Sequence, residues 1–194
     1  MRRLVLASQS PARLALLQAA GFAPEVVVSG VDESGATGTP TEICLSLAQL
    51  KCRAVVAGLS APDAVVVGCD SVLELDGVAY GKPKDAADAV ARWQLMSGRT
   101  GILRTGHCIV VGGRECSAVA STVVRFGTPS GDEIAAYVAT GEPLFVAGAF
   151  TIDGRGSLFV DGIDGDHTNV VGLSLPTFRR LLAELDVSAV DLWV

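Results

Sequence analysis

The sequence contains few aromatic residues, few charged residues and two isolated histidines. Aromatic residues make up 5% of the 194 residues and charged residues 19%, and the histidines are His107 and His167. A His-based catalytic triad or a histidine metal cluster is therefore not supported, because both need further groups converging on the imidazole. No uncharged apolar stretch reaches the ~18–20 residues that span a bilayer, so we expect no membrane partner.

The cysteines form no recognisable framework. There are five of them, an odd number, and no two are spaced as C-x-x-C. This pattern argues against both a disulfide scaffold and a zinc ribbon, and it favours small buried side chains in a reducing compartment. The apolar start of the chain stops at Ser8, which is too early for a secretory signal peptide. We therefore expect a cytoplasmic protein.

The charge balance is acidic, with 15 basic and 21 acidic residues and a net charge of −6. Proteins that bind nucleic-acid polymers usually carry a basic surface, so that class is disfavoured, whereas a small anionic ligand in a locally basic pocket is not. Hydrophobic residues make up 49% of the chain, which is enough for a folded core. The length and the absence of a linker predict a single domain over residues 1–194.

Strand-like and helix-like segments alternate along the chain, which predicts a mixed α/β domain. A serine or threonine that can cap a helix stands before three of the helical segments, namely Ser10, Thr39 and Ser130. We expect helices at 11–20, 40–58, 85–96, 131–141 and 175–185. We expect strands at 4–7, 25–29, 64–70, 72–75, 77–80, 104–111, 117–126, 146–152 and 157–160.

The first segment that could carry chemistry is the predicted strand-to-helix turn at residues 7–13. A helix N-terminus presents unpaired amides and a partial positive charge, and therefore attracts anions. Ser8, Ser10 and Arg13 would add two hydroxyls and a guanidinium suited to phosphate. Taken locally, an ordinary helix cap beside a surface arginine explains the same residues.

Two further segments carry a carboxylate and a lysine. Asp70 follows an apolar strand, where ligands gather in open α/β sheets, but a turn-forming aspartate explains it equally well. Lys82 lies in Gly81-Lys82-Pro83, which lacks the glycine spacing and the following Ser or Thr of a P-loop. Since Gly-x-Gly-x-x-Gly is also absent, neither a P-loop nucleotide hydrolase nor a dinucleotide enzyme is favoured.

Taken together and in order, these segments resemble the Maf family of nucleotide pyrophosphatases over nearly the whole chain. Each motif is unspecific by itself, but the ordered set with compatible spacing is very specific. The matching segments are residues 6–13, 31–33, 47–51, 68–71, 81–83, 95–100, 141–143, 147–150, 163–165 and 169–173.

The resemblance implies an elongated mixed sheet flanked by helices, with two lobes and a central cleft, as in the Maf and inosine-triphosphatase group. It also implies hydrolysis of nucleoside triphosphates, including modified ones, to the monophosphate and pyrophosphate. A divalent cation, Mg²⁺ or Mn²⁺, is implied as cofactor, and homodimers are common in the family.

The resemblance also assigns site residues. The proton acceptor of the family falls on Asp70, and a second acid near the metal and the phosphates falls on Glu33. These two carboxylates are the metal ligands that the resemblance implies. The groups that face the phosphates fall on Ser8, Arg13, Lys51 and Lys82. Without the resemblance, Lys51 would be read as a solvated lysine in the middle of a helix.

Three positions associated with base choice in the family fall on Ala12, Ser71 and Asp153. Members that prefer pyrimidines carry other residues at all three positions, and the pattern of members that prefer 7-methyl-GTP matches no better. Gly101 also stands where the family usually has a histidine. The preferred base is therefore left open, whereas the reaction is not.

Two other functions fit parts of the pattern. A nucleotide-binding regulator of septum formation would keep Ser8, Arg13 and Lys82 but would not need Asp70 and Glu33 together. A phosphatase of another phosphorylated metabolite would release orthophosphate rather than pyrophosphate. The presence of both acids favours the pyrophosphatase.

Overall fold

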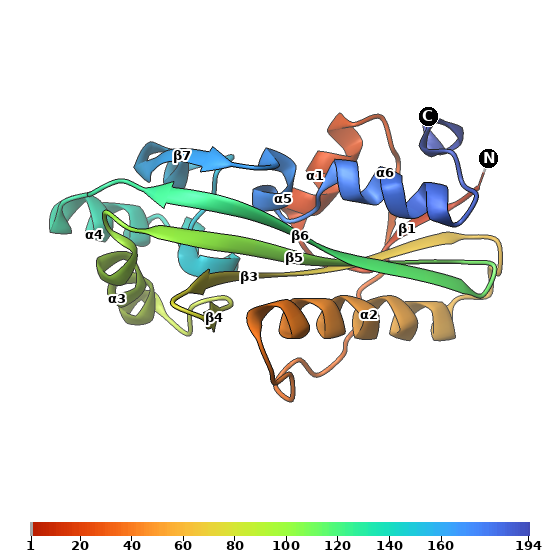
Figure 1. Cartoon of the computed structure of the whole chain (residues 1–194), viewed down its shortest axis with the longest axis horizontal. Helices are drawn as coiled ribbons and strands as arrows, with labels where there is room; N and C mark the ends of the chain where they lie inside the picture. Colours follow the sequence, from red (N-terminus) through yellow and green to blue (C-terminus); the bar gives the residue numbers. More distant parts are fainter. Residues whose placement is uncertain (1) are drawn as a thin grey trace.

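The computed structural model describes residues 2–194, and a seven-stranded mixed sheet runs along its length (Figure 1). The strand order is β2-β1-β3-β5-β6-β7, and β4 pairs with β3. The strands are β1 Leu4–Leu6, β2 Glu25–Val26, β3 Val65–Leu75, β4 Val78–Tyr80, β5 Thr100–Val111, β6 Arg114–Phe126 and β7 Val160–Asp164. The α-helices are α1 Pro11–Ala19, α2 Pro40–Gly58, α3 Ala86–Met96, α4 Gly131–Ala139, α5 His167–Val171 and α6 Leu175–Glu184. The short 3₁₀ helices are η1 Glu142–Phe145, η2 Ala147–Ala149, η3 Arg155–Phe159 and η4 Ala189–Leu192.

The central strand β3 has one edge that is only partly paired. On that side β1 runs parallel to it along residues 65–67, and β4 runs antiparallel to it along residues 73–75. Among residues 2–194, no strand pairs with residues 68–72 of β3 on this side. We call residues 68–72 the open edge of β3.

Helices cover both faces of the sheet (Figure 1). At the end of the sheet where both chain termini lie, α2 packs on one face, and α1 and α6 pack on the other (Figure 1). Each face there has its own cluster of buried apolar side chains. A third cluster joins α3 and α4 to the other end of β3, β5 and β6. The predicted elongated α/β architecture is therefore confirmed, and the cleft between two lobes stays a prediction.

Two glycines set the distance between α2 and the sheet. A Cβ atom on Gly68 would lie 2.5 Å from the carbonyl oxygen of Ala48, and one on Gly106 would lie 2.2 Å from that of Cys44. Such distances are far below van der Waals contact, so only glycine allows the helix backbone to come this close. This close contact holds α2 directly over the middle of β3 and β5.

All five predicted helices are present, and the three predicted caps are formed. Ser10 caps α1, and Thr39 and Ser130 each form a complete capping box with the glutamate three residues later. The two predicted strand segments at 64–70 and 72–75 form one continuous strand, β3. Asp76 and Gly77 both have positive φ in the tight turn that leads into β4, as the predicted hairpin requires.

Several predicted strands are wrong. Residues 25–29 form only the two-residue strand β2, and residues 146–152 form no strand. Gly148 and Ala149 have left-handed backbone angles, which are incompatible with an extended strand, and the carbonyl of Ala149 accepts a hydrogen bond from Trp93. Residues 157–159 belong to a 3₁₀ helix, and the strand β7 begins only at Val160.

No helix within residues 2–194 combines the length and the apolar character needed to cross a membrane.

Candidate functional site

The turn between β1 and α1 buries an arginine. Ser10 caps the helix by accepting a hydrogen bond from the backbone N–H of Arg13, and the Ser8 hydroxyl accepts one from the backbone N–H of Ser10. Arg13 does not extend into solvent, since it is 9% exposed. The interpretation as an ordinary cap beside a surface arginine is therefore wrong for Arg13.

Lys51 lies between two carboxylates. It projects from α2, and its Nζ lies 2.6 Å from Oδ1 of Asp70 and 2.9 Å from Oε1 of Glu33. Lys51 and Asp70 are both 8% exposed, whereas the Glu33 side chain is half exposed. Lys51 is therefore no surface lysine, and Asp70, which lies within β3, is no turn-forming aspartate.

Burial and charge act on Asp70 in opposite directions. Burial disfavours the ionised carboxylate, and the Lys51 ammonium and the Arg13 guanidinium favour it. Burial is the larger influence, so the pKa of Asp70 is raised above its ordinary value. A carboxylate with a raised pKa is a better proton acceptor than an ordinary surface aspartate.

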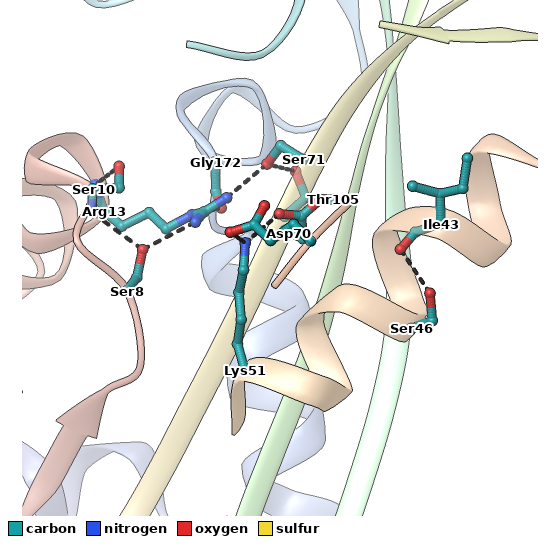
Figure 2. A network of polar contacts seen from close by, with 11 residues as sticks. Ser8, Ser10, Arg13, Ile43, Ser46, Lys51, Asp70, Ser71, Thr105 and Gly172 are labelled. Carbon is teal, nitrogen blue, oxygen red and sulfur yellow. Dashed lines mark hydrogen bonds and ion pairs between the residues drawn. The ribbon is translucent and has the colours of Figure 1, made fainter. Parts of the chain in front are cut away.

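The arginine and the lysine approach neighbouring residues of β3 from opposite faces of the sheet. Successive side chains of a strand point to opposite faces, so Asp70 faces α2 and Ser71 faces α1. Both residues lie in the open edge of β3, where β1 has already ended. Figure 2 shows that Arg13 and Lys51 thereby come to the same region.

Three of the predicted site residues are not joined to the group formed by Arg13, Lys51, Asp70 and Glu33. Among the described residues, no hydrogen bond or ion pair links the side chain of Lys82 or Asp153 to Arg13, Lys51, Asp70 or Glu33, and the Ala12 methyl group has no atom that could form one. Lys82 and Asp153 are exposed and Ala12 is partly buried. The segment that carries Lys82 is nevertheless fixed, because Arg92 donates hydrogen bonds to the carbonyls of Gly81 and Lys82.

The structure adds a residue to this group that the sequence did not reveal. Thr105 lies directly opposite Ser71 in the pairing of β5 with β3, and their hydroxyl oxygens are 2.8 Å apart. A threonine in a long apolar strand carries no local signal of such a contact. The register of the two strands would be needed to predict it.

Two hydrogen bonds to backbone groups fix the His107 ring. Its Nε2 accepts a hydrogen bond from the backbone N–H of Ser174, so Nδ1 carries the proton and donates it to the carbonyl of Thr105. Burial lowers the pKa of His107 to about 4, and the imidazole is therefore neutral at pH 7.

The chemistry of the donor atoms allows a divalent cation at this site. Asp70 and Glu33 each use one carboxylate oxygen to contact Lys51, and the second oxygen of each makes no hydrogen bond among the described residues. No cluster of three or more His, Cys, Asp or Glu side chains arranged to hold a metal occurs in residues 2–194. Since Mg²⁺ is usually held by one or two carboxylates together with substrate phosphates, the two carboxylates fit such an ion.

Comparison with known proteins places this chain in a family. Residues 3–185 match the family model described as "Maf-like protein". A "Nucleoside triphosphate pyrophosphatase" of Streptomyces coelicolor is 64% identical over 99% of this chain and 95% of its own. One of Cyanothece sp. is 51% identical over the full length of both chains. A solved "Nucleoside-triphosphatase / dITP/XTP pyrophosphatase" of Mycobacterium abscessus shares 18% identity, covers 94% of each chain and has a TM-score of 0.43. With the family model covering nearly the whole chain and relatives this similar, the chain belongs to the Maf-like family.

Proposed function

We propose that this protein hydrolyses nucleoside triphosphates to the nucleoside monophosphate and pyrophosphate, with residues 1–194 acting as one unit. The observation that carries the proposal is the convergence of Asp70, Lys51 and Arg13 at the open edge of β3. A triphosphate needs cations around its oxygens and a carboxylate that can accept a proton from water. The names of the full-length relatives support the same reaction.

Arg13 is suited to hold a phosphate. Its guanidinium has five N–H groups, and three of them donate to Gly172, Ser8 and Ser71. The other two make no hydrogen bond within residues 2–194 and are available for phosphate oxygens, and the three internal contacts fix their direction before the substrate arrives. Lys82, which is exposed, adds a positive charge that can approach the outer phosphates.

Asp70 is the residue that we assign as general base. Its Oδ1 is held by Lys51, so its Oδ2 is left, with one lone pair to accept a proton from water and a second for the cation assigned below. The water oxygen attacks the α-phosphorus, the bond between this phosphorus and the bridging oxygen breaks, and pyrophosphate leaves. Lys51 keeps the carboxylate oriented and stabilises its negative charge.

Asp70 and Glu33 are the residues that we assign to hold Mg²⁺ or Mn²⁺. A divalent cation bound there would neutralise charge on the phosphates and on the departing pyrophosphate. The same two carboxylates keep Lys51 in place through its contacts of 2.6 and 2.9 Å. Chelation of divalent cations is expected to abolish turnover, and addition of Mg²⁺ or Mn²⁺ should restore it.

The reaction is tested with a panel of nucleoside triphosphates, including modified ones, and separation of the products. Equal amounts of monophosphate and pyrophosphate are expected, and orthophosphate as the primary product would point to a phosphatase instead. Asp70→Asn is expected to lower kcat by about 10²–10⁴-fold. Asp63→Asn, an exposed aspartate ahead of the same strand, is the matched control. Full activity of Asp70→Asn would exclude the assigned base.

The alternative is a nucleotide-binding regulator of cell division without turnover. Tight binding of a triphosphate, with no hydrolysis in any divalent cation, would favour it. The proposal also includes a cytoplasmic location and a homodimer. Light scattering of the purified protein tests the homodimer, since a monomer at working concentrations would exclude it.

A further inference from the structure

Arg13 is held by partners from three separate parts of the chain. Its Nε donates to the carbonyl of Gly172 at 2.7 Å, and its two terminal nitrogens donate to the hydroxyls of Ser8 at 3.1 Å and Ser71 at 3.0 Å (Figure 2). The Ser8 contact lies within the same turn as Arg13. The other two contacts therefore fix the guanidinium relative to the rest of the fold.

The hydrogen of each hydroxyl can be assigned. Thr105 donates its single hydroxyl hydrogen to the carbonyl of Asn169 at 3.2 Å. It therefore accepts from Ser71, whose oxygen lies 2.8 Å away. Because Ser71 donates to Thr105, its lone pairs are left to accept from Arg13.

Thr105 also anchors the second partner of Arg13. Asn169 and Gly172 belong to one helical turn, since the backbone N–H of Gly172 donates to the carbonyl of Asn169 at 3.0 Å. The Thr105 hydroxyl binds this same carbonyl, so one side chain fixes both Ser71 and the turn that carries Gly172. The contacts close a ring that begins and ends at Arg13.

The ring is shielded from solvent where it depends on Thr105. Thr105 and Asn169 are both 0% exposed. The Asn169 side chain is also tied to the sheet, through a hydrogen bond of 3.1 Å to the carbonyl of Leu103. Water is therefore poorly placed to replace the Thr105 hydroxyl if it is removed, and a buried partner would be left unsatisfied.

We infer that Thr105 is a positioning residue which, through Ser71 and the turn at Asn169–Gly172, aims the two free N–H groups of Arg13 at a substrate phosphate. This inference rests on the proposed function. It assigns Ser71 to the phosphate end of the site, whereas the family resemblance associates that position with base choice. Every nucleoside triphosphate carries the same phosphates. Loss of this ring of contacts therefore weakens the binding of all nucleoside triphosphates by the same factor.

The test uses a probe without a base. Binding of inorganic tripolyphosphate in the presence of Mg²⁺ is measured by calorimetry, and kcat/KM is measured for triphosphates of four different bases. Thr105→Val and Ser71→Ala are each expected to weaken tripolyphosphate binding by about tenfold. They should lower kcat/KM by the same factor for all four bases. Thr105→Ser keeps the hydroxyl and should stay within about twofold of the parent protein.

Two controls separate positioning from general stability. Thr151→Val makes the same change at a threonine whose hydroxyl donates to Glu142, and among the described residues no hydrogen bond links Thr151 to Ser71, Asn169 or Gly172. It should lower the melting temperature as Thr105→Val does, but keep the tripolyphosphate affinity within about twofold. In an Arg13→Lys background, Thr105→Val should have little further effect on binding, because its influence passes through Arg13.

Several results would overturn the inference. One is a Ser71→Ala protein whose ranking of bases changes while its tripolyphosphate affinity does not. Another is equal affinity of Thr105→Val and Thr105→Ser. If the parent protein binds tripolyphosphate but hydrolyses no nucleotide, the proposed function fails and the binding data still decide the role of Thr105. If it neither binds nor hydrolyses, both are refuted.

Discussion

The close contact between α2 and the sheet gives a quantitative prediction for Gly68→Ala. The added Cβ would lie 2.5 Å from the carbonyl oxygen of Ala48 and 2.9 Å from the Cβ of Cys52, whereas ordinary contact begins at 3.4 Å. The helix must therefore move away from β3 by about 1 Å, because carbon and oxygen atoms cannot overlap. Ala48 and Cys52 flank Lys51 on α2, so Lys51 moves with them.

This displacement affects both activity and stability. The contact between Lys51 and Asp70, now 2.6 Å, would lengthen beyond good hydrogen-bond geometry. A misplacement of about 1 Å can lower kcat about 10²-fold. Overpacking of this kind costs about 1–3 kcal/mol in the free energy of unfolding. For a chain of this length, each 1 kcal/mol lowers Tm by about 2–4 °C.

Pyrophosphate release gives kcat, and thermal denaturation gives Tm. Gly58→Ala is the matched control, because Gly58 ends the same helix and a Cβ there would have no neighbour within 4 Å. The control should keep the kcat and the Tm of the parent protein. If Gly68→Ala behaved like Gly58→Ala, the claim that the glycine contact sets the position of Lys51 would be refuted.

Two further predictions concern residues other than Asp70, Lys51 and Arg13. Arg92→Lys has one terminal nitrogen in place of the two that donate separately to the Gly81 and Lys82 carbonyls. KM should therefore rise about five- to tenfold, with kcat within twofold. An equal fall in kcat would contradict this, and the exposed Arg53→Lys serves as control. His107 has its pKa lowered by burial from 6.5 to about 4, so between these pH values the unfolded chain binds a proton there that the folded chain does not. The free energy of unfolding should therefore fall by about 3 kcal/mol as the pH falls through this window, and His107→Gln should remove this dependence in denaturant titrations.

Local chemistry in the sequence predicts the helices and their starts well. Ser10, Thr39 and Ser130 cap helices because a hydroxyl satisfies free amides within three residues, and nothing distant is needed. The turn at Asp76-Gly77 is equally local, since its positive φ values follow from the residue types.

Features that depend on distant contacts were not predictable in this way. The apolar residues 146–150 suggest a strand, but their burial against Trp93 and the left-handed angles at Gly148 and Ala149 produce 3₁₀ turns. The Ser71–Thr105 contact depends on the register between β3 and β5. The family resemblance pointed to Lys51, Asp70 and Glu33, while local reasoning alone would have left Lys51 in solvent.

The position of the site at the open edge of β3 has a consequence for how its residues can change during evolution. Asp70 and Ser71 are adjacent in the chain, yet Asp70 contacts a residue of α2 and Ser71 contacts a residue of α1, and these two helices pack in different apolar clusters. Under the proposed function, substitutions on the α1 side can change how the substrate phosphates are bound, while Asp70 and Lys51 on the α2 side keep their surroundings. Under that proposal, a one-residue step along one strand separates recognition from reaction, and each can evolve with its own supporting core.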